Sequence, residues 1–281
     1  MAETPNVRLC LSNRAENVLL VRQTLSGLAE TIGLSPVELN DVSTAVSEAC
    51  NNVVLHAYGG GEGPLEVEIR ASSPVLEVVV RDRGCGIQPR DVDHEEVAGG
   101  IGLPVIRALT QEVEFNDLGG AGTEVRMRFA TAHPRTLELA GKELSPGAAT
   151  RRDPPTAHGT LAFTVGPPAL ARAVLPRVLS ALAARAHFST DRISDTQLLA
   201  DALLAHAEGS LDASCLSVDV ELEPRSLELR IGPLRAGRSE AVLEEATLDG
   251  LGSVLERLSD GHEISREGAS ETLGLRLAEH R

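Results

Sequence analysis

The chain has 281 residues, 42% of them hydrophobic, which is enough to bury at least one full core and, by length, allows two domains. Its 41 acidic and 26 basic residues give a formal net charge of -15, and such a charge repels nucleic-acid phosphates and anionic lipid head groups. No run approaches the roughly 18 apolar residues of a membrane span, and the N-terminal residues do not form an apolar signal segment. We therefore expect a cytoplasmic protein that binds neither nucleic acid nor membrane.

The four cysteines, Cys10, Cys50, Cys85 and Cys215, are scattered and include no CxxC pair. This spacing suits a reducing compartment and argues against a zinc site or a disulfide framework. We interpret them as small apolar residues.

Periodicity in the first half predicts an alternation of strands and helices. Strand-like and helix-like segments in this order predict an α/β fold, specifically an α+β two-layer sandwich with helices on one face of a mixed β-sheet. In chain order the predicted elements are a strand at Val7–Leu11, helices at Ala15–Ile32 and from Ser35 to His56, strands at Leu65–Ala71 and Val75–Arg81, a helix at Leu103–Leu109, and strands at Glu112–Asn116 and Thr123–Phe129.

A stretch rich in Pro, Gly, Thr and charges, residues 133–158, predicts a linker between domains at 1–132 and 159–281. The second half repeats the element order of the first, which indicates a duplicated domain. Two unrelated α/β domains are the alternative. The predicted elements of the second half are strands at Leu161–Val165, Leu216–Leu222, Ser226–Ile231 and Thr272–Leu277, and helices at Leu170–Ala186, Asp195–Ala207 and Leu251–Leu258.

The second predicted helix carries chemically useful side chains at helical spacing. Glu48, Asn52 and His56 recur every four residues, so they stack along one stripe of an α-helix. The solvated side of an ordinary amphipathic helix has the same pattern. The stripe therefore indicates a functional site only in combination with the segments on its C-terminal side.

Three glycine-rich segments come after that helix. Asp82 ends a predicted strand directly before Gly84 and Gly86, where tight turns approach a planar ligand and a carboxylate can accept a hydrogen bond from an exocyclic amine. Gly99 to Gly102 opens a helix, whose free N–H groups suit phosphates. Gly122-Thr123 precedes the last strand. Each cluster alone is typical of a plain turn, whereas the ordered combination indicates a nucleotide site.

At these residues the sequence resembles the GHKL, or Bergerat-fold, ATPases over about residues 7–130. The resemblance covers the N box, both glycine boxes and the terminal Gly-Thr of that superfamily. The matching stretches are Glu48 through Asn52, Asp82-Arg83-Gly84-Cys85-Gly86, Gly100-Ile101-Gly102-Leu103 and Gly122-Thr123.

The resemblance implies a Mg-ATP site. Asn52 would hold Mg²⁺, Asp82 would bind adenine with help from Thr123, and Glu48 would be the general base for attack on the γ-phosphate. His56 would be either a cationic neighbour of the phosphates or a neutral packed histidine. The implied ATP-binding set is Asn51, Asn52, His56, Asp82, Gly84, Gly86, Gly100, Ile101, Gly102, Leu103 and Thr123.

Within the superfamily, the segment from Ser47 to Tyr58 is similar to the SEA-x-x-N-x-x-x-HA-Y signature of anti-sigma regulatory factors that are protein-serine kinases. The resemblance implies ATP-dependent phosphorylation of a serine on a STAS-domain anti-anti-sigma protein, and binding of a sigma factor. A non-catalytic, nucleotide-gated binding module is the main alternative. A histidine-kinase fragment is less compatible, because the chain lacks dimerising helices with a phosphoacceptor histidine.

The second half resembles a degenerate copy of the same domain. In the sequence register, Glu48, Asn52 and Asp82 face Ala202, His206 and Pro233, and Gly122-Thr123 is replaced by Ser270-Glu271. In the loop after Asp82 only Gly86 keeps a counterpart, Gly237, whereas the glycine segment that opens the third helix retains Gly250 and Gly252. We expect a pseudo-ATPase domain. Since the subgroup acts through homodimers, the protein would be a homodimer or an intramolecular pseudo-dimer.

Overall fold

The computed structural model describes residues 5–72, 74–85, 102–131, 160–248 and 252–280. The chain divides into two compact units, which within these ranges comprise residues 5–131 and residues 160–280. The predicted linker at 133–158 lies outside the described residues. Among the described helices, none is both long and apolar enough to cross a membrane.

The first unit contains every strand and helix expected from its sequence, with one helix altered at its end. Its elements are β1 (Val7–Ser12), α1 (Ala15–Ile32), α2 (Pro36–Asn52), a π-helical turn η1 (Val53–Ala57), β2 (Pro64–Ser72), β3 (Val75–Asp82), α3 (Gly102–Leu109), β4 (Glu112–Asp117) and β5 (Thr123–Ala130).

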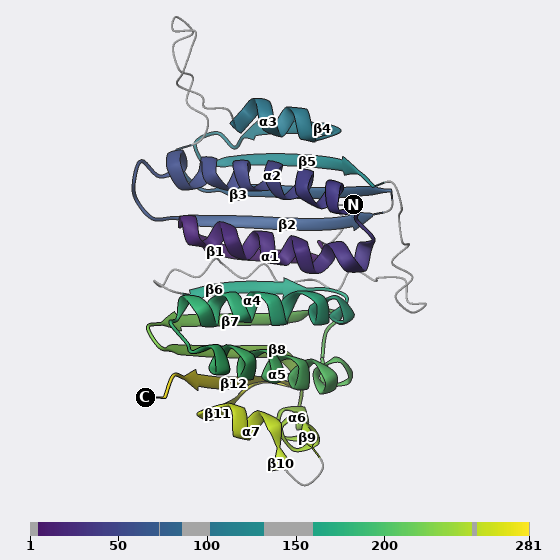
Figure 1. Cartoon of the computed structure of the whole chain (residues 1–281), viewed down its shortest axis with the longest axis vertical. Helices are drawn as coiled ribbons and strands as arrows, with labels where there is room; N and C mark the ends of the chain where they lie inside the picture. Colours follow the sequence, from purple (N-terminus) through teal and green to yellow (C-terminus); the bar gives the residue numbers. More distant parts are fainter. Residues whose placement is uncertain (1–4, 73, 86–101, 132–159, 249–251, 281) are drawn as a thin grey trace, which may run out of the picture. The chain divides into compact units, whose positions relative to one another are not determined.

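The five strands of this unit form a sheet in the order β1-β2-β3-β5-β4, and each neighbouring pair is antiparallel. This differs from the mixed sheet predicted from the sequence. β3 and β4 are connected through α3 and run parallel to each other, as such a connection favours. They are not paired, because β5 lies between them. Figure 1 shows α1 and α2 lying side by side across one face of these strands, so the α+β two-layer arrangement is confirmed.

The core of the first unit lies between the sheet and its helices. Alternate residues of each strand point to the helix layer, so a row of buried side chains crosses the sheet through register partners. One such row is Leu9, Val67, Val80 and Val125. Asp82 comes two residues after Val80 and therefore faces the helices as well, at the end of β3.

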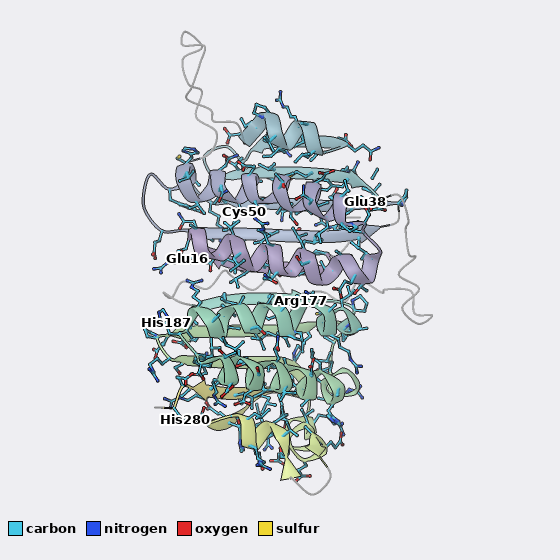
Figure 2. The ribbon with its side chains drawn as sticks, viewed as in Figure 1. Glu16, Glu38, Cys50, Arg177, His187 and His280 are labelled. Carbon is cyan, nitrogen blue, oxygen red and sulfur yellow. The ribbon has the colours of Figure 1, made fainter. Side chains whose placement is uncertain are left out.

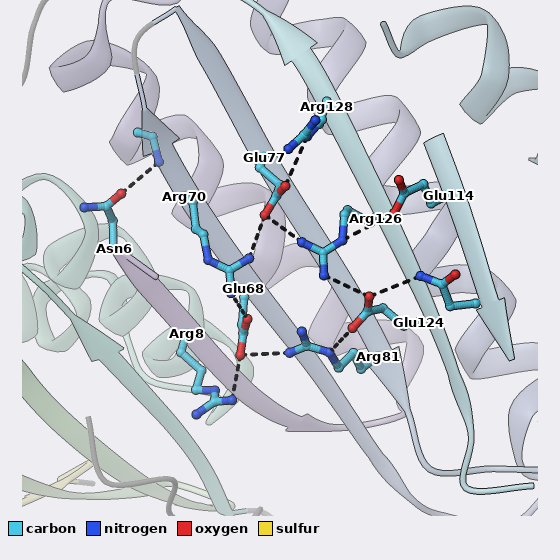
Figure 3. Close-up of polar contacts among 12 residues, drawn as sticks. Asn6, Arg8, Glu68, Arg70, Glu77, Arg81, Glu114, Glu124, Arg126 and Arg128 are labelled. Carbon is cyan, nitrogen blue, oxygen red and sulfur yellow. Dashed lines mark hydrogen bonds and ion pairs between the residues drawn. The ribbon is translucent and has the colours of Figure 1, made fainter. Parts of the chain in front are cut away.

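The opposite face of this sheet carries arginine and glutamate side chains paired with one another (Figure 3). Glu68, for example, lies 2.6 Å from Arg8, 2.6 Å from Arg70 and 2.8 Å from Arg81. We call this set the ion-pair lattice. It comprises Arg8, Arg70, Arg81, Arg83, Arg126, Arg128, Glu66, Glu68, Glu77, Glu112, Glu114 and Glu124.

The start of α2 is defined by its own sequence. Ser35 accepts a hydrogen bond from the backbone N–H of Glu38, while the Glu38 carboxylate accepts one from the backbone N–H of Ser35, and Pro36 occupies the first helical position. Glu38 is labelled at this end of the helix in Figure 2. These caps set where α2 begins and thus which of its residues face the site.

The second unit is built from a further set of strands and helices. They are β6 (Thr160–Val165), η2 (Pro168–Leu170), α4 (Ala171–Arg185), α5 (Thr190–Ala207), η3 (Glu208–Ser210), β7 (Leu216–Glu223), β8 (Ser226–Arg235), α6 (Arg238–Glu245), β9 (Thr247–Leu248), β10 (Gly252–Ser253), α7 (Val254–Leu258), β11 (Gly261–Glu267) and β12 (Ser270–Ala278).

Its main sheet has the order β6-β7-β8-β12-β11, again antiparallel throughout. Strand by strand this matches β1-β2-β3-β5-β4, with two long helices after the first strand in each unit. The two units are thus alike in the order of their strands and helices. That the second unit arose by duplication of the first is a proposal.

Apart from the short turns η2 and η3, the elements of the second unit that were not expected from the sequence are α6, β9, β10 and β11. α6 and β11 are polar segments, and in the described part of β11 only Ile264 is apolar, because this strand lies at a sheet edge and is largely exposed. The helix predicted at Leu251–Leu258 is shorter in the structure, α7, and is preceded by β10.

Candidate nucleotide site

Two polar side chains of α2 converge on the first residue of α3. A Cβ atom placed on Gly102 would lie 3.0 Å from Glu48 Oε2 and 3.5 Å from Asn52 Oδ1. Both side chains are half-buried, and Gly102 itself is buried. The four-residue spacing therefore does place the carboxylate and the carboxamide together, and it places them at a helix N-terminus, where free N–H groups favour anions.

The helical segment runs past His56, as predicted, but it is not an α-helix throughout. The α-helix ends at Asn52, and Val53–Ala57 form a π-helical turn in which bonds span five residues instead of four. His56 therefore leaves the stripe of Glu48 and Asn52. It is exposed, and its described contact is through its carbonyl oxygen, which lies 4.0 Å from Cys85 Sγ.

Asp82 is buried at the end of β3, on the side of the sheet that faces the helices. Its Oδ1 accepts hydrogen bonds from the backbone N–H groups of Gly84, at 2.8 Å, and Thr123, at 3.2 Å. Within the described part of the chain these are the hydrogen bonds of the Asp82 carboxylate, and Oδ1 accepts both of them. The geometry leaves Oδ2 to accept a hydrogen bond from a ligand.

Two glycines around Asp82 allow backbone contacts that a side chain would prevent. A Cβ on Gly84 would lie 2.0 Å from the carbonyl oxygen of Ala57, and a Cβ on Gly122 would lie 2.0 Å from the carbonyl oxygen of Asp82. Gly122 also has a φ of +112°, in the region that favours glycine. The close packing brings the end of the Asn52 helix, the Asp82 loop and the Gly122-Thr123 turn against one another.

The remaining predicted residues are divided between described and undescribed parts of the chain. Asn51 is half-buried on α2, and Leu103 is 41% exposed beside Gly102. Gly86, Gly100 and Ile101 lie outside the described residues.

Sequence reasoning missed a contribution from Ala57, the last residue of the π turn, and from Tyr58, which follows it. The Tyr58 hydroxyl accepts a hydrogen bond from the backbone N–H of Arg83 at 2.8 Å, and the Ala57 carbonyl accepts one from Cys85 N–H at 3.0 Å. The signal was present, because Tyr58 is the one tyrosine of the chain and ends the Ser47–Tyr58 signature segment.

The residues present fit a magnesium ion that is shared with phosphate oxygens. Among the described residues, no group of three or more His, Cys, Asp and Glu side chains could hold a metal alone. Mg²⁺ at triphosphate sites needs few protein ligands, because phosphate oxygens and water fill its other positions. The Asn52 carboxamide oxygen, next to the Glu48 carboxylate, is a suitable oxygen donor.

The corresponding region of the second unit has different chemistry. Pro233 stands where the sequence register puts the Asp82 counterpart, and His206 Nδ1 lies 4.0 Å from Glu245 of α6. The carboxylate of Glu271 accepts hydrogen bonds from the backbone N–H groups of Gly237 and Ser239 at the start of α6. The Gly237 bond is the main cause that lowers the pKa of Glu271 to about 2. This carboxylate therefore fastens a helix to the sheet.

Comparison with known proteins places these features in a family. Residues 11–129 match the family described as histidine kinase-like ATPase domain. The serine-protein kinase RsbW of Bacillus pumilus is 31% identical over 150 residues, covering 47% of this chain and 93% of that protein. RsbW of Bacillus licheniformis is 35% identical over 114 residues, covering 36% and 71%. A solved structure of RsbU and RsbW domains from Mycobacterium tuberculosis is 23% identical, with a TM-score of 0.35, covering 47% and 34%.

The fold and the matched residues define the first unit as a histidine kinase-like ATPase domain. Within that class, the chain belongs to the family of the RsbW serine-protein kinases. The matched region lies in the first unit, and the site residues described above lie within it.

Proposed function

We propose that the first unit binds Mg-ATP and transfers the γ-phosphoryl group to a serine of a small STAS-domain antagonist. The observation that carries the proposal is the convergence of Glu48 and Asn52 on Gly102, at the N-terminus of α3. The relatives named serine-protein kinase RsbW support the reaction class.

In this proposal Glu48 accepts the proton of the attacking serine hydroxyl, and Asp82 accepts a hydrogen bond from the adenine amine through Oδ2. Asn52 holds the magnesium ion, which neutralises charge on the triphosphate when bound. The N–H groups at the start of α3 favour the phosphates. Positioning and charge neutralisation would supply most of the rate, since phosphoryl transfer needs little covalent chemistry from the protein.

The proposal is tested with labelled ATP, a purified STAS-domain protein encoded near this one, and two variants. We expect Glu48→Gln to lower phosphoryl transfer at least a hundredfold while ATP affinity changes little, because the general base acts only in the reaction. Asp82→Asn should weaken ATP binding itself. Glu244→Gln, at an exposed position on α6, is the control and should behave as the unaltered protein. Transfer that persists in Glu48→Gln would contradict the proposed role.

The alternative is a switch in which ATP gates partner binding without catalysis. It predicts that Glu48→Gln leaves every functional readout intact, whereas Asp82→Asn abolishes ATP-dependent capture of a partner. The two variants therefore separate the alternatives in one experiment.

We further propose that the protein is cytoplasmic, that it sequesters a sigma factor, and that its second unit is a degenerate ATPase-like domain standing in for a partner subunit. The shared strand order of the two units supports the last point. Light scattering should then give the mass of one chain. A stable dimer of full-length chains would make an intramolecular partner unnecessary.

A further inference from the structure

Two hydrogen bonds, which we call the clasp, join the loop after Asp82 to Ala57 and Tyr58 at the end of the π turn. Tyr58 Oη accepts from Arg83 N–H at 2.8 Å, and the Ala57 carbonyl accepts from Cys85 N–H at 3.0 Å. These bonds bracket Gly84, which packs directly on the Ala57 carbonyl. The three residues after Asp82 are therefore all fixed to one short segment.

The Tyr58 ring is itself held in place. Its hydroxyl donates to the Pro64 carbonyl at 2.5 Å while accepting from Arg83, so it bridges the start of β2 and the end of β3. Gly63 leaves the space for the ring, because a Cβ there would lie 2.1 Å from Tyr58 Cε1. Burial raises the pKa of the Tyr58 hydroxyl to about 12, so the donated proton is retained at neutral pH.

The clasp acts on Asp82 through its neighbours in the chain. Asp82 Oδ1 is oriented by the backbone N–H of Gly84, which lies between the two clasped residues Arg83 and Cys85. If the Tyr58 bond is lost, the peptide between Asp82 and Gly84 can rotate, and the donor that orients Oδ1 moves with it. The direction of Oδ2 then becomes less defined.

We propose that Tyr58 is a positioning residue that sets the orientation of the Asp82 carboxylate and thereby the selectivity of the site for a 6-aminopurine nucleotide. This inference rests on the proposed ATP site. Tyr58 acts through Arg83 and Gly84, and its hydroxyl is already occupied by two protein partners. Selectivity, rather than phosphate binding, is what its loss should change.

The experiment measures the affinities of the full-length protein for Mg-ATP and Mg-ITP by isothermal titration calorimetry. ITP keeps the triphosphate and ribose but has an oxygen in place of the 6-amino donor. We expect the unaltered protein to prefer ATP, and we expect Tyr58→Phe to lower the ATP-to-ITP affinity ratio about tenfold, which corresponds to about 1.4 kcal/mol. Most of the change should come from weaker ATP binding.

Two further variants make the result specific. Gly63→Ala disturbs the same ring from the other side and should lower the same ratio. Thr131→Val removes a hydroxyl that donates to the Pro74 carbonyl at 3.0 Å, at the opposite end of β3, and should leave the ratio unchanged. A mere loss of folded protein reduces the binding-competent fraction for both nucleotides equally, so it does not alter the ratio.

The outcomes separate this inference from the function on which it rests. If the unaltered protein binds neither nucleotide, the proposed ATP site is wrong. If it binds ATP selectively and both Tyr58→Phe and Gly63→Ala keep that selectivity, the ATP site stands and the role of Tyr58 is overturned.

Discussion

Glycine 122 shows how closely the backbone packs around the acidic residue of the site. It has a φ of +112°, and a Cβ there would lie 2.0 Å from the Asp82 carbonyl oxygen. Gly120, in the same turn, has a φ of +83° but open space around it. Both positions therefore need a backbone with positive φ, but only Gly122 lacks the space for a side chain.

Substitution of these glycines by alanine should separate the two effects. Both variants carry the strain of a left-handed backbone, of order 1–2 kcal/mol. Gly122→Ala should lose a further 1–3 kcal/mol or so of unfolding free energy, because the methyl group overlaps the Asp82 backbone. It should also weaken ATP binding, whereas Gly120→Ala should not. Urea unfolding and nucleotide titration of the pair provide the test, and equal behaviour of the two variants would contradict it.

At single positions, sequence reasoning worked where a regular period applied. The 3.6-residue period put Glu48 and Asn52 on one side of α2, and the structure brings both to Gly102. The same period misplaced His56, because the helix changes to a π turn after Asn52. The signature segment singles out Tyr58, but its partner could not be predicted, since the bond joins residues 25 positions apart through a backbone N–H that carries no sequence signal.

Among the elements, the sheet of the first unit has an unusual outer face. Burial raises the pKa of Glu77 and Glu124, but their hydrogen bonds from arginines outweigh it, and both pKa values are below the ordinary one. The Glu77 carboxylate, for example, accepts hydrogen bonds from three arginines, Arg70, Arg126 and Arg128. The sheet is thus stabilised by groups that titrate in acid.

These shifts set the sign of the pH effect on stability. A carboxylate whose folded pKa is depressed takes up protons more readily when unfolded, so its contribution is present above the unfolded value, about 4.3, and is lost as the pH falls through the folded value. We expect the unfolding free energy of the full-length protein to fall below about pH 4.3, and Glu77→Gln to reduce that slope. Urea titrations between pH 7 and pH 3 measure it, with Glu244→Gln as the control. A slope unchanged in Glu77→Gln would exclude this role.

Element prediction succeeded for apolar segments and failed for polar ones. Strands β2, β3 and β5 of the first unit carry alternating apolar residues that reach the core, which gives a strong pattern. α6 was missed because only one of its turns is apolar, with Val242 and Leu243 buried, and its start depends on the distant carboxylate of Glu271. Long-range partners of this kind leave no local trace in the sequence.

At the scale of the whole molecule, the two units share a strand order but differ in the residues at the end of the third strand and directly after it. The first has the Asp82 loop, and the second has Pro233 and α6. A ligand that binds only one folded unit should stabilise only that unit.

Calorimetry of the full-length protein should therefore show an asymmetric response to Mg-ATP. At a free concentration of 100 times Kd, the unit of residues 5–131 should gain about 2.7 kcal/mol, and the transition of the other unit should not shift. Asp82→Asn identifies the first transition, because it should abolish the gain. A shift of both transitions, or one that survives Asp82→Asn, would show that the second unit binds nucleotide or that the site lies elsewhere.

The ion-pair lattice also bears on how the protein meets other molecules. Its six arginines and six glutamates cancel. The whole chain nevertheless carries a formal charge of -15, so the excess must be located on other surfaces. A cationic protein diffusing nearby is consequently drawn toward those surfaces and gains little attraction from the neutral back of this sheet. Encounter rates that drop steeply as salt is added would be the kinetic expression of that uneven distribution.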